Sequence, residues 1–189
     1  MQDASKKEIL AWSMYDFANS AFATTIIAVV FQKYLVESVV PSTGAHLGPF
    51  RWDGPTVWSV GYGTSMVISA VMAPIIGAVC DYSAAKKRYL ATFWLMGCLA
   101  TASLGFVVPG GWLLGLLLFI AGNVAFESSV SLNSAFLPEL APADRLDKIS
   151  SIGWGIGYLG GGLCLFANLL MIMMPQWVGH PVPTTEEIG

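Results

Sequence analysis

Two acidic side chains interrupt long apolar stretches of this sequence. Glu127 follows an uncharged run from Tyr89 to Phe126, and Asp16 lies in an apolar stretch that begins at Ile9. A charged side chain at the middle of a membrane costs about 2.5 to 3.5 kcal/mol, so such an acid needs a partner, a water-filled cavity or a bound proton. Both acids are therefore candidates for moving a proton or a polar solute. For Glu127, the other interpretation is that a protonated acid ties two helices together. Asp16 would instead lie at the membrane interface if the first span started near Phe17.

Further polar residues recur at helical spacing beside the two acids. A helix turns by about 100° per residue, which places amide and hydroxyl groups close to the face of each acid. The residues near Glu127 are Asn123, Ser131 and Ser134, and those near Asp16 are Asn19, Ser20 and Thr24. We expect both stripes to face the bundle interior or a water-filled path. The predicted substrate and proton pathway consists of Asp16, Asn19, Asn123 and Glu127.

The residue patterns of common enzymes and metal sites do not occur in this sequence. Both histidines fall in polar segments, the HExxH pattern is absent, and no nucleophile stands beside a base. The three cysteines lie inside apolar runs without CxxC spacing, which is typical of small buried residues. No basic patch with interleaved aromatic residues indicates nucleic acid. We therefore predict no enzyme activity, no cofactor, no metal and no nucleic-acid partner.

The composition places these residues in a membrane. Hydrophobic residues make up 55% of the 189 positions and charged residues only 11%, whereas soluble domains carry about 25% charged residues. The apolar runs reach the roughly 20 residues that a helix needs to cross about 30 Å of hydrocarbon. The lipid bilayer is thus a predicted partner, and the expected fold is an all-α, polytopic membrane helical bundle.

Five transmembrane helices follow from the lengths of the apolar runs. The uncharged run that begins at Tyr89 would make a helix of about 57 Å, too long for one crossing, and Pro109-Gly110-Gly111 supplies its break. Polar segments at 37–55 and 138–148 are expected to be loops. The predicted spans form a single transmembrane domain over residues 1–189 and cover about 9–36, 57–80, 89–108, 112–137 and 149–174.

Lysine and arginine are concentrated in alternate connecting segments. If the amino terminus is inside, the outer segments hold only Arg51, with Lys33 at the outer edge of the first span, as the positive-inside rule requires. The inner cations are Lys6, Lys7, Lys86, Lys87, Arg88, Arg145 and Lys148. We expect a multi-pass protein of the cell (cytoplasmic or inner) membrane with a cytoplasmic amino terminus.

Glycines recur at steps of three and four residues in the fifth predicted span. They are Gly153, Gly157, Gly160 and Gly161. A face of small residues lets another helix approach closely, so we interpret this face as a packing surface.

Three stretches of the sequence resemble a known family of membrane proteins. They are Gly77-x-x-x-Asp81 with the following basic cluster, the segment from Trp12 to Ile27, and the segment from Ile149 to Phe166. Together they resemble the major facilitator superfamily, in the branch related to the vacuolar amino-acid effluxers of autophagy. The resemblance implies that Asp81 caps a neighbouring helix and pairs with cations when the cytoplasmic side is closed. The implied gate loop comprises Gly77, Asp81, Lys86, Lys87 and Arg88, although Ala84 and Ala85 replace the glycine and arginine of the family pattern.

The resemblance implies a secondary active transporter. We expect a small polar solute such as an amino acid to move by alternating access, with the proton as a candidate coupling ion. The superfamily has two six-helix halves, and five spans make a partial amino-terminal half. The expected partners are therefore missing carboxyl-terminal helices or further copies of the chain. A non-transporting membrane scaffold and a truncated, inactive transporter fragment stay open as alternatives.

Overall fold

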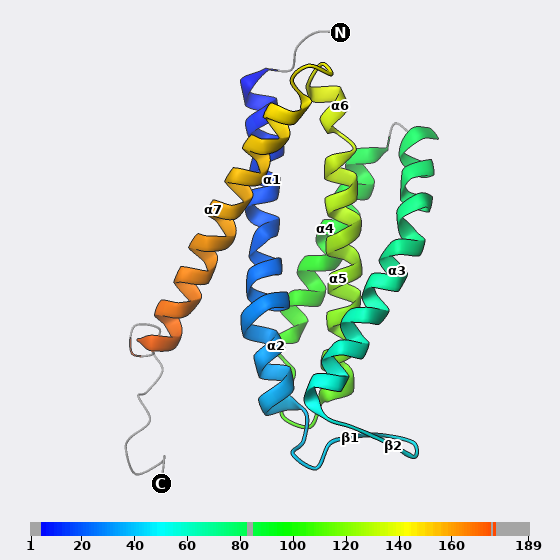
Figure 1. Cartoon of the computed structure of the whole chain (residues 1–189), viewed down its shortest axis with the longest axis vertical. Helices are drawn as coiled ribbons and strands as arrows, with labels where there is room; N and C mark the ends of the chain where they lie inside the picture. Colours follow the sequence, from blue (N-terminus) through cyan, green and yellow to red (C-terminus); the bar gives the residue numbers. More distant parts are fainter. Residues whose placement is uncertain (1–4, 83–84, 175, 177–189) are drawn as a thin grey trace.

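The computed structural model describes residues 5–82, 85–174 and 176, and these residues confirm the all-α class. Long helices run roughly side by side, and a small two-stranded hairpin lies at one end of the bundle (Figure 1). The described part of the amino terminus lies at the opposite end, near the short helix α6 (Leu137–Leu140). The connections between helices alternate between the two ends, as in a multi-pass bundle.

The first helical rod contains two π-helical segments. It consists of α1 (Lys6–Phe22), a π-helical segment (Ala23–Val29), α2 (Val30–Tyr34) and a second π-helical segment (Leu35–Val39). Ser5 caps the rod, because its hydroxyl accepts a hydrogen bond from the Glu8 amide at 3.3 Å while the Glu8 carboxylate accepts from the Ser5 amide at 2.7 Å. A π-helical segment changes the face on which the following side chains lie, and such segments are frequent at functional sites.

The predicted loop at 37–55 is wrong in part, because it contains a β-hairpin. Strand β1 (Ala45–Leu47) pairs antiparallel with β2 (Phe50–Trp52), with His46 opposite Arg51. The two-residue turn starts at Gly48, whose φ of 60° is a conformation that glycine adopts readily. Strands of three residues are too short to show an alternating pattern in the sequence, which is why the segment read as a loop.

The next long helix begins at a capped position, and a turn separates the two long helices that follow it. Helix α3 (Gly54–Tyr82) starts after Asp53, whose carboxylate accepts a hydrogen bond from the Thr56 amide at 3.0 Å, and this contact with Thr56 holds the pKa of Asp53 below its ordinary value. Helix α4 (Lys86–Leu104) ends before a turn in which Gly110 has a φ of 86°. Helix α5 (Trp112–Ser134) follows at once, so the predicted break at Pro109-Gly110-Gly111 agrees with the structure.

The polar segment 138–148 is also more ordered than a loop. It contains most of the short helix α6 (Leu137–Leu140) and the start of α7 (Leu146–Met173). Pro138 lies in the first turn of α6, where its missing amide hydrogen is not needed. A proline there starts a helix, although the same residue in a polar sequence also suggests a loop.

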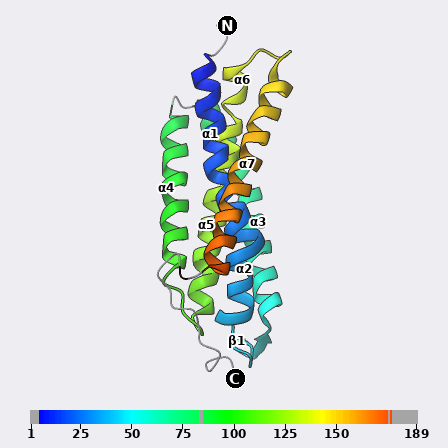
Figure 2. The ribbon, with the colours of Figure 1, turned by 90° about the vertical axis from the view of Figure 1, so that its left-hand side faces the viewer.

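The helices pack around α1 and α5. Helix α1 packs against α7, and α5 packs against both α3 and α4. Within each of the pairs α1–α7 and α3–α5 the helices run in the same direction, whereas α4 runs opposite to α5 (Figure 1). In the view turned by 90°, α4 flanks the bundle beside α1 and α5 (Figure 2). The larger cluster of buried hydrophobic residues lies toward the hairpin end and includes Phe31, Leu35, Val57, Leu116 and Phe119.

Four helical segments within the described residues are long and apolar enough to cross a membrane. They are Lys6–Val39, Gly54–Ala78, Trp112–Leu140 and Leu146–Met173. Helix α4 is the fifth long helix, but three cations occupy its first turn and only 19 residues belong to it. The prediction of five spans therefore corresponds to five long helices, of which four qualify by length and composition.

Candidate functional site

The glycine face of α7 lies against α1. A Cβ atom at Gly153 would meet the Trp12 ring, and one at Gly160 would meet the backbone of Phe17. All four predicted packing glycines are buried: Gly153, Gly157, Gly160 and Gly161. These glycines let the two helix backbones approach closely, as small residues do in membrane bundles.

Asp16 lies within this close contact between α1 and α7. Its carboxylate touches the position that a Cβ atom of Gly157 would occupy, and the Ser20 hydroxyl lies on the same side. The side chain is partly buried. Within the described residues no hydrogen bond or ion pair reaches this carboxylate. Asp16 therefore lies in a segment that can cross a membrane. No cation among the described residues forms an ion pair with its carboxylate.

Glu127 is the corresponding acid on α5. It is partly buried and lies in the segment Trp112–Leu140, which is apolar and long enough to span a membrane. No cation or hydrogen-bond donor contacts its carboxylate within the described parts of the chain, and the Ser131 hydroxyl donates instead to the Glu127 backbone carbonyl at 3.0 Å. The two acids thus stand on the two helices around which the bundle packs.

Asn123 joins α5 to α3. Its side chain is fully buried and donates a hydrogen bond to the Ser65 hydroxyl at 2.8 Å. Ser65 in turn donates to the Tyr62 carbonyl at 2.7 Å. The side-chain oxygen of Asn123 has no partner among the described residues. Although Asn123 and Glu127 are one turn apart, the structure gives Asn123 an interhelical contact with α3.

Replacing Asn123 with alanine should destabilise the bundle by about 1 kcal/mol, because interhelical hydrogen bonds in membrane bundles average ~0.6 and reach ~1.7 kcal/mol. Unfolding of the purified protein in mixed micelles, for Asn123→Ala, Ser65→Ala and the double variant, measures the coupling. Strict additivity of the two single effects would show that the hydrogen bond contributes nothing.

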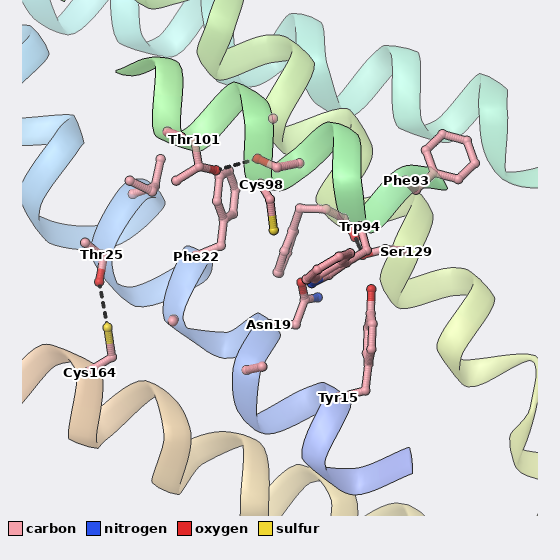
Figure 3. Close-up of a pocket in the computed structure, with 17 residues that line it drawn as sticks. Tyr15, Asn19, Phe22, Thr25, Phe93, Trp94, Cys98, Thr101, Ser129 and Cys164 are labelled. Atoms are coloured by element: carbon pink, nitrogen blue, oxygen red, sulfur yellow. Dashed lines mark hydrogen bonds between the residues drawn. The ribbon is translucent and has the colours of Figure 1, made fainter. Parts of the chain in front are cut away.

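A cavity of about 460 Å³ lies between α1, α4 and α5, with Cys164 of α7 at its edge (Figure 3). Of the four predicted pathway residues, only Asn19 lines it. The walls are mostly aromatic and aliphatic, and include Phe22, Phe93, Trp94 and Phe126. The polar groups that sequence reasoning did not select are Tyr15, Thr25, Cys98, Thr101, Ser129 and Cys164.

A hydrogen-bonded cluster at the edge of this cavity was also missed. The Asn168 amide donates to the Thr25 hydroxyl at 2.8 Å, and Thr25 lies 3.4 Å from the Cys164 sulfur. Because Thr25 accepts from Asn168, its own hydroxyl hydrogen is available to the sulfur. The sequence could have indicated Asn168, because it is an amide side chain within an apolar span. The π-helical segment that holds Thr25 gave no signal of its own.

The predicted gate loop lies at the amino-terminal end of the bundle. Gly77 has open space where a Cβ atom would stand. Asp81 belongs to the last turn of α3, but its side chain, like residues 83 and 84, lies outside the described part of the structure. Lys86 binds Glu139 of α6 at 2.6 Å and stands 5.9 Å from the Phe136 ring centre. Lys87 and Arg88 are exposed.

This architecture is that of a multi-pass membrane protein. Its apolar helices are long enough to cross a membrane, and the two acids lie on the central helices α1 and α5. Comparison of the sequence shows the family. Residues 59–180 match the family described as vacuole effluxer Atg22 like, and the chain belongs to this family. The resemblance to the effluxer branch of the major facilitator superfamily is thus confirmed.

Two of the relatives are named as a transporter and as an autophagy protein. An uncharacterized MFS-type transporter, YxiO of Bacillus subtilis (strain 168), is 28% identical over 176 residues, which cover 93% of this chain and 40% of YxiO. Autophagy-related protein 22 of Gibberella zeae is 26% identical over 160 residues, which cover 72% of this chain and 24% of the relative. No solved structure matches the chain. The chain therefore spans less than half the length of these relatives.

Proposed function

We propose that this chain forms part of a secondary active transporter that moves a small polar solute, such as an amino acid, by alternating access. The observation that carries the proposal is the pair Asp16 and Glu127. Each acid lies in a segment able to cross a membrane and lacks a described cation partner. Such acids inside apolar spans mark substrate or proton paths in membrane proteins. Membership of an effluxer family supports the same conclusion.

The proton is the coupling ion that best suits the carboxyl groups of Asp16 and Glu127. A carboxyl group in an apolar span is neutral when protonated, and it becomes costly when it is charged and unpaired. Contact with water on one side of the membrane would release the proton, and the solute would then enter or leave. Asn19, which lines the cavity, and Asn123 at the α3 contact complete the proposed pathway.

The rest of the path would come from outside the described bundle. In transporters built from repeats, the substrate site lies at the interface between the repeats. Further carboxyl-terminal helices or additional copies of the chain would supply the opposite wall. The segments at the end opposite the hairpin (Figure 1) contain Lys6, Lys7, Lys86, Lys87 and Arg88. This distribution supports an orientation with that end in the cytoplasm, and we propose that the protein lies in the cell (cytoplasmic or inner) membrane. The gate loop around Asp81 would close this end.

A non-transporting scaffold is the competing proposal. The buried Asn123–Ser65 hydrogen bond favours it, because this member of the polar stripe joins helices. An inactive transporter fragment would have the same features.

Uptake of labelled amino acids into proteoliposomes tests the proposal. The longest natural form of the polypeptide is reconstituted, and uptake is compared with and without an imposed pH gradient. A proton-coupled transporter should accumulate at least one amino acid only when the gradient is present. If proteoliposomes take up every tested amino acid no faster than protein-free vesicles do, the result would favour the non-transporting scaffold.

A further inference from the structure

Two neighbouring cavities lie along α1 and α4 on one flank of the bundle. The cavity of about 460 Å³ and a smaller one of about 220 Å³ share Tyr15 and Trp94 in their walls. The smaller cavity is also lined by Leu90, Ala91 and Lys87, which belong to the first turns of α4. We call the two cavities together the α1–α4 groove. The end formed by the smaller cavity carries the Lys87 ammonium group, whereas the larger cavity is mostly apolar.

The apolar part of the groove is open on the membrane side. Ala18, Trp94 and Cys98 are exposed, and Trp94 has 51% of its residue surface accessible. Figure 3 shows the Cys98 sulfur and the Phe22 ring pointing into this space from opposite helices. At the level of a membrane span the surrounding solvent is hydrocarbon, so an open apolar groove takes up lipid chains rather than water.

The polar end of the groove matches an anion. Lys87 is exposed, and no ion pair involves it within the described residues. The neighbouring carboxylate, Glu8, interacts electrostatically with Lys87 and also accepts hydrogen bonds from the Ser5 amide and hydroxyl in the helix cap. Arg88 is exposed beside Lys87, and Lys6 and Lys7 begin α1 at the same end. Clusters of lysine and arginine next to membrane spans attract anionic lipid headgroups.

Tyr15 places a phenol group in the wall of the groove. Its oxygen is covered, and the Ser129 hydroxyl is the polar side-chain group that acts on it. Tyr15 lines both cavities, between the ammonium group and the apolar part. Tyrosine commonly lies where an apolar region meets a polar one in membranes. The glycerol and ester groups of a lipid would lie at the level of this ring when the lipid phosphate lies near Lys87.

We propose that the α1–α4 groove binds an anionic phospholipid of the leaflet at the amino-terminal end. Its phosphate contacts Lys87, its ester groups lie beside the Tyr15 ring, and one acyl chain lies beside Trp94 and Phe22. Asp16 and Glu127 of the proposed transport pathway do not line the groove, whereas Asn19 of that pathway lies in the wall of its larger cavity.

Native mass spectrometry of the purified full chain tests this site. The protein is reconstituted in vesicles of phosphatidylcholine with phosphatidylglycerol, extracted with mild detergent, and the retained lipids are counted. The unaltered protein should retain phosphatidylglycerol in preference to phosphatidylcholine. Lys87→Gln should reduce that preference several-fold, whereas Lys148→Gln, which removes an exposed cation at the start of α7 and outside the groove, should leave it unchanged.

A second variant separates a true groove from a diffuse charge effect. Ala18→Leu fills the apolar part without altering charge, and it should lower retention of both lipids. Equal losses for Lys87→Gln and Lys148→Gln would overturn the proposal in favour of general attraction to a basic surface. Unchanged retention in Ala18→Leu would also overturn it, because another helix or a second copy of the chain would then cover the groove.

Discussion

Replacing Gly160 with alanine is expected to destabilise the protein by about 1 to 3 kcal/mol, the usual cost of overpacking a tight contact. The added methyl group would meet the backbone carbonyl of Phe17 on α1. Backbone atoms cannot rotate aside as the end of a flexible side chain can, so α7 must move away from α1. This loss should appear even though alanine favours a helix by about 1 kcal/mol over glycine.

The same helix provides a matched control. Gly162 has no atom within 4 Å of the position of an added Cβ. Gly162→Ala should therefore keep or slightly raise stability, because only the helix preference changes. Detergent-induced unfolding of both variants, followed by circular dichroism, gives the comparison. Equal stabilities for Gly160→Ala and Gly162→Ala would contradict the close contact between α1 and α7.

Removing the carboxyl group of Glu127 is expected to abolish coupled transport. Glu127→Gln keeps the size and hydrogen-bonding capacity of the side chain but cannot release a proton. Glu127→Leu removes the polarity as well. If Glu127 carries the coupling proton, both variants should lower gradient-driven uptake by about a hundredfold or more, which is the scale on which positioned proton-transfer groups act. Uptake of labelled amino acid under an imposed pH gradient measures the effect.

Glu37→Gln is the control for the loss of one acid. Glu37 lies at the hairpin end, 61% of its side chain is exposed, and it stands 3.9 Å from Lys33. Exposed pairs of this kind contribute little, about 0 to 1 kcal/mol. Uptake should therefore stay near the unaltered level. If Glu127→Gln also keeps gradient-driven uptake while Glu127→Leu unfolds, Glu127 is a packing residue and the proton role is wrong.

The sequence alone determined the class of the protein and the positions of its main breaks. A bilayer sets a minimum length for an apolar helix, and every backbone group must be satisfied within it, so composition and run length predict the helices directly. The turn at Pro109-Gly110-Gly111 was predicted because glycine and proline act locally. The motif around Gly77 and Asp81 likewise indicated the family.

Only the tertiary structure decided which neighbour each polar side chain meets. Helical spacing relates Asn123 to Glu127 on one helix, but it does not say that Asn123 meets Ser65 of α3 or that Asp16 lies against Gly157 of α7. In a membrane, lipid tails and helix neighbours are equally apolar, so a hydrophobic pattern does not point a helix face toward its partner. The π-helical segment at Thr25 and the α1–α4 groove depend on contacts between distant segments, which no local pattern encodes.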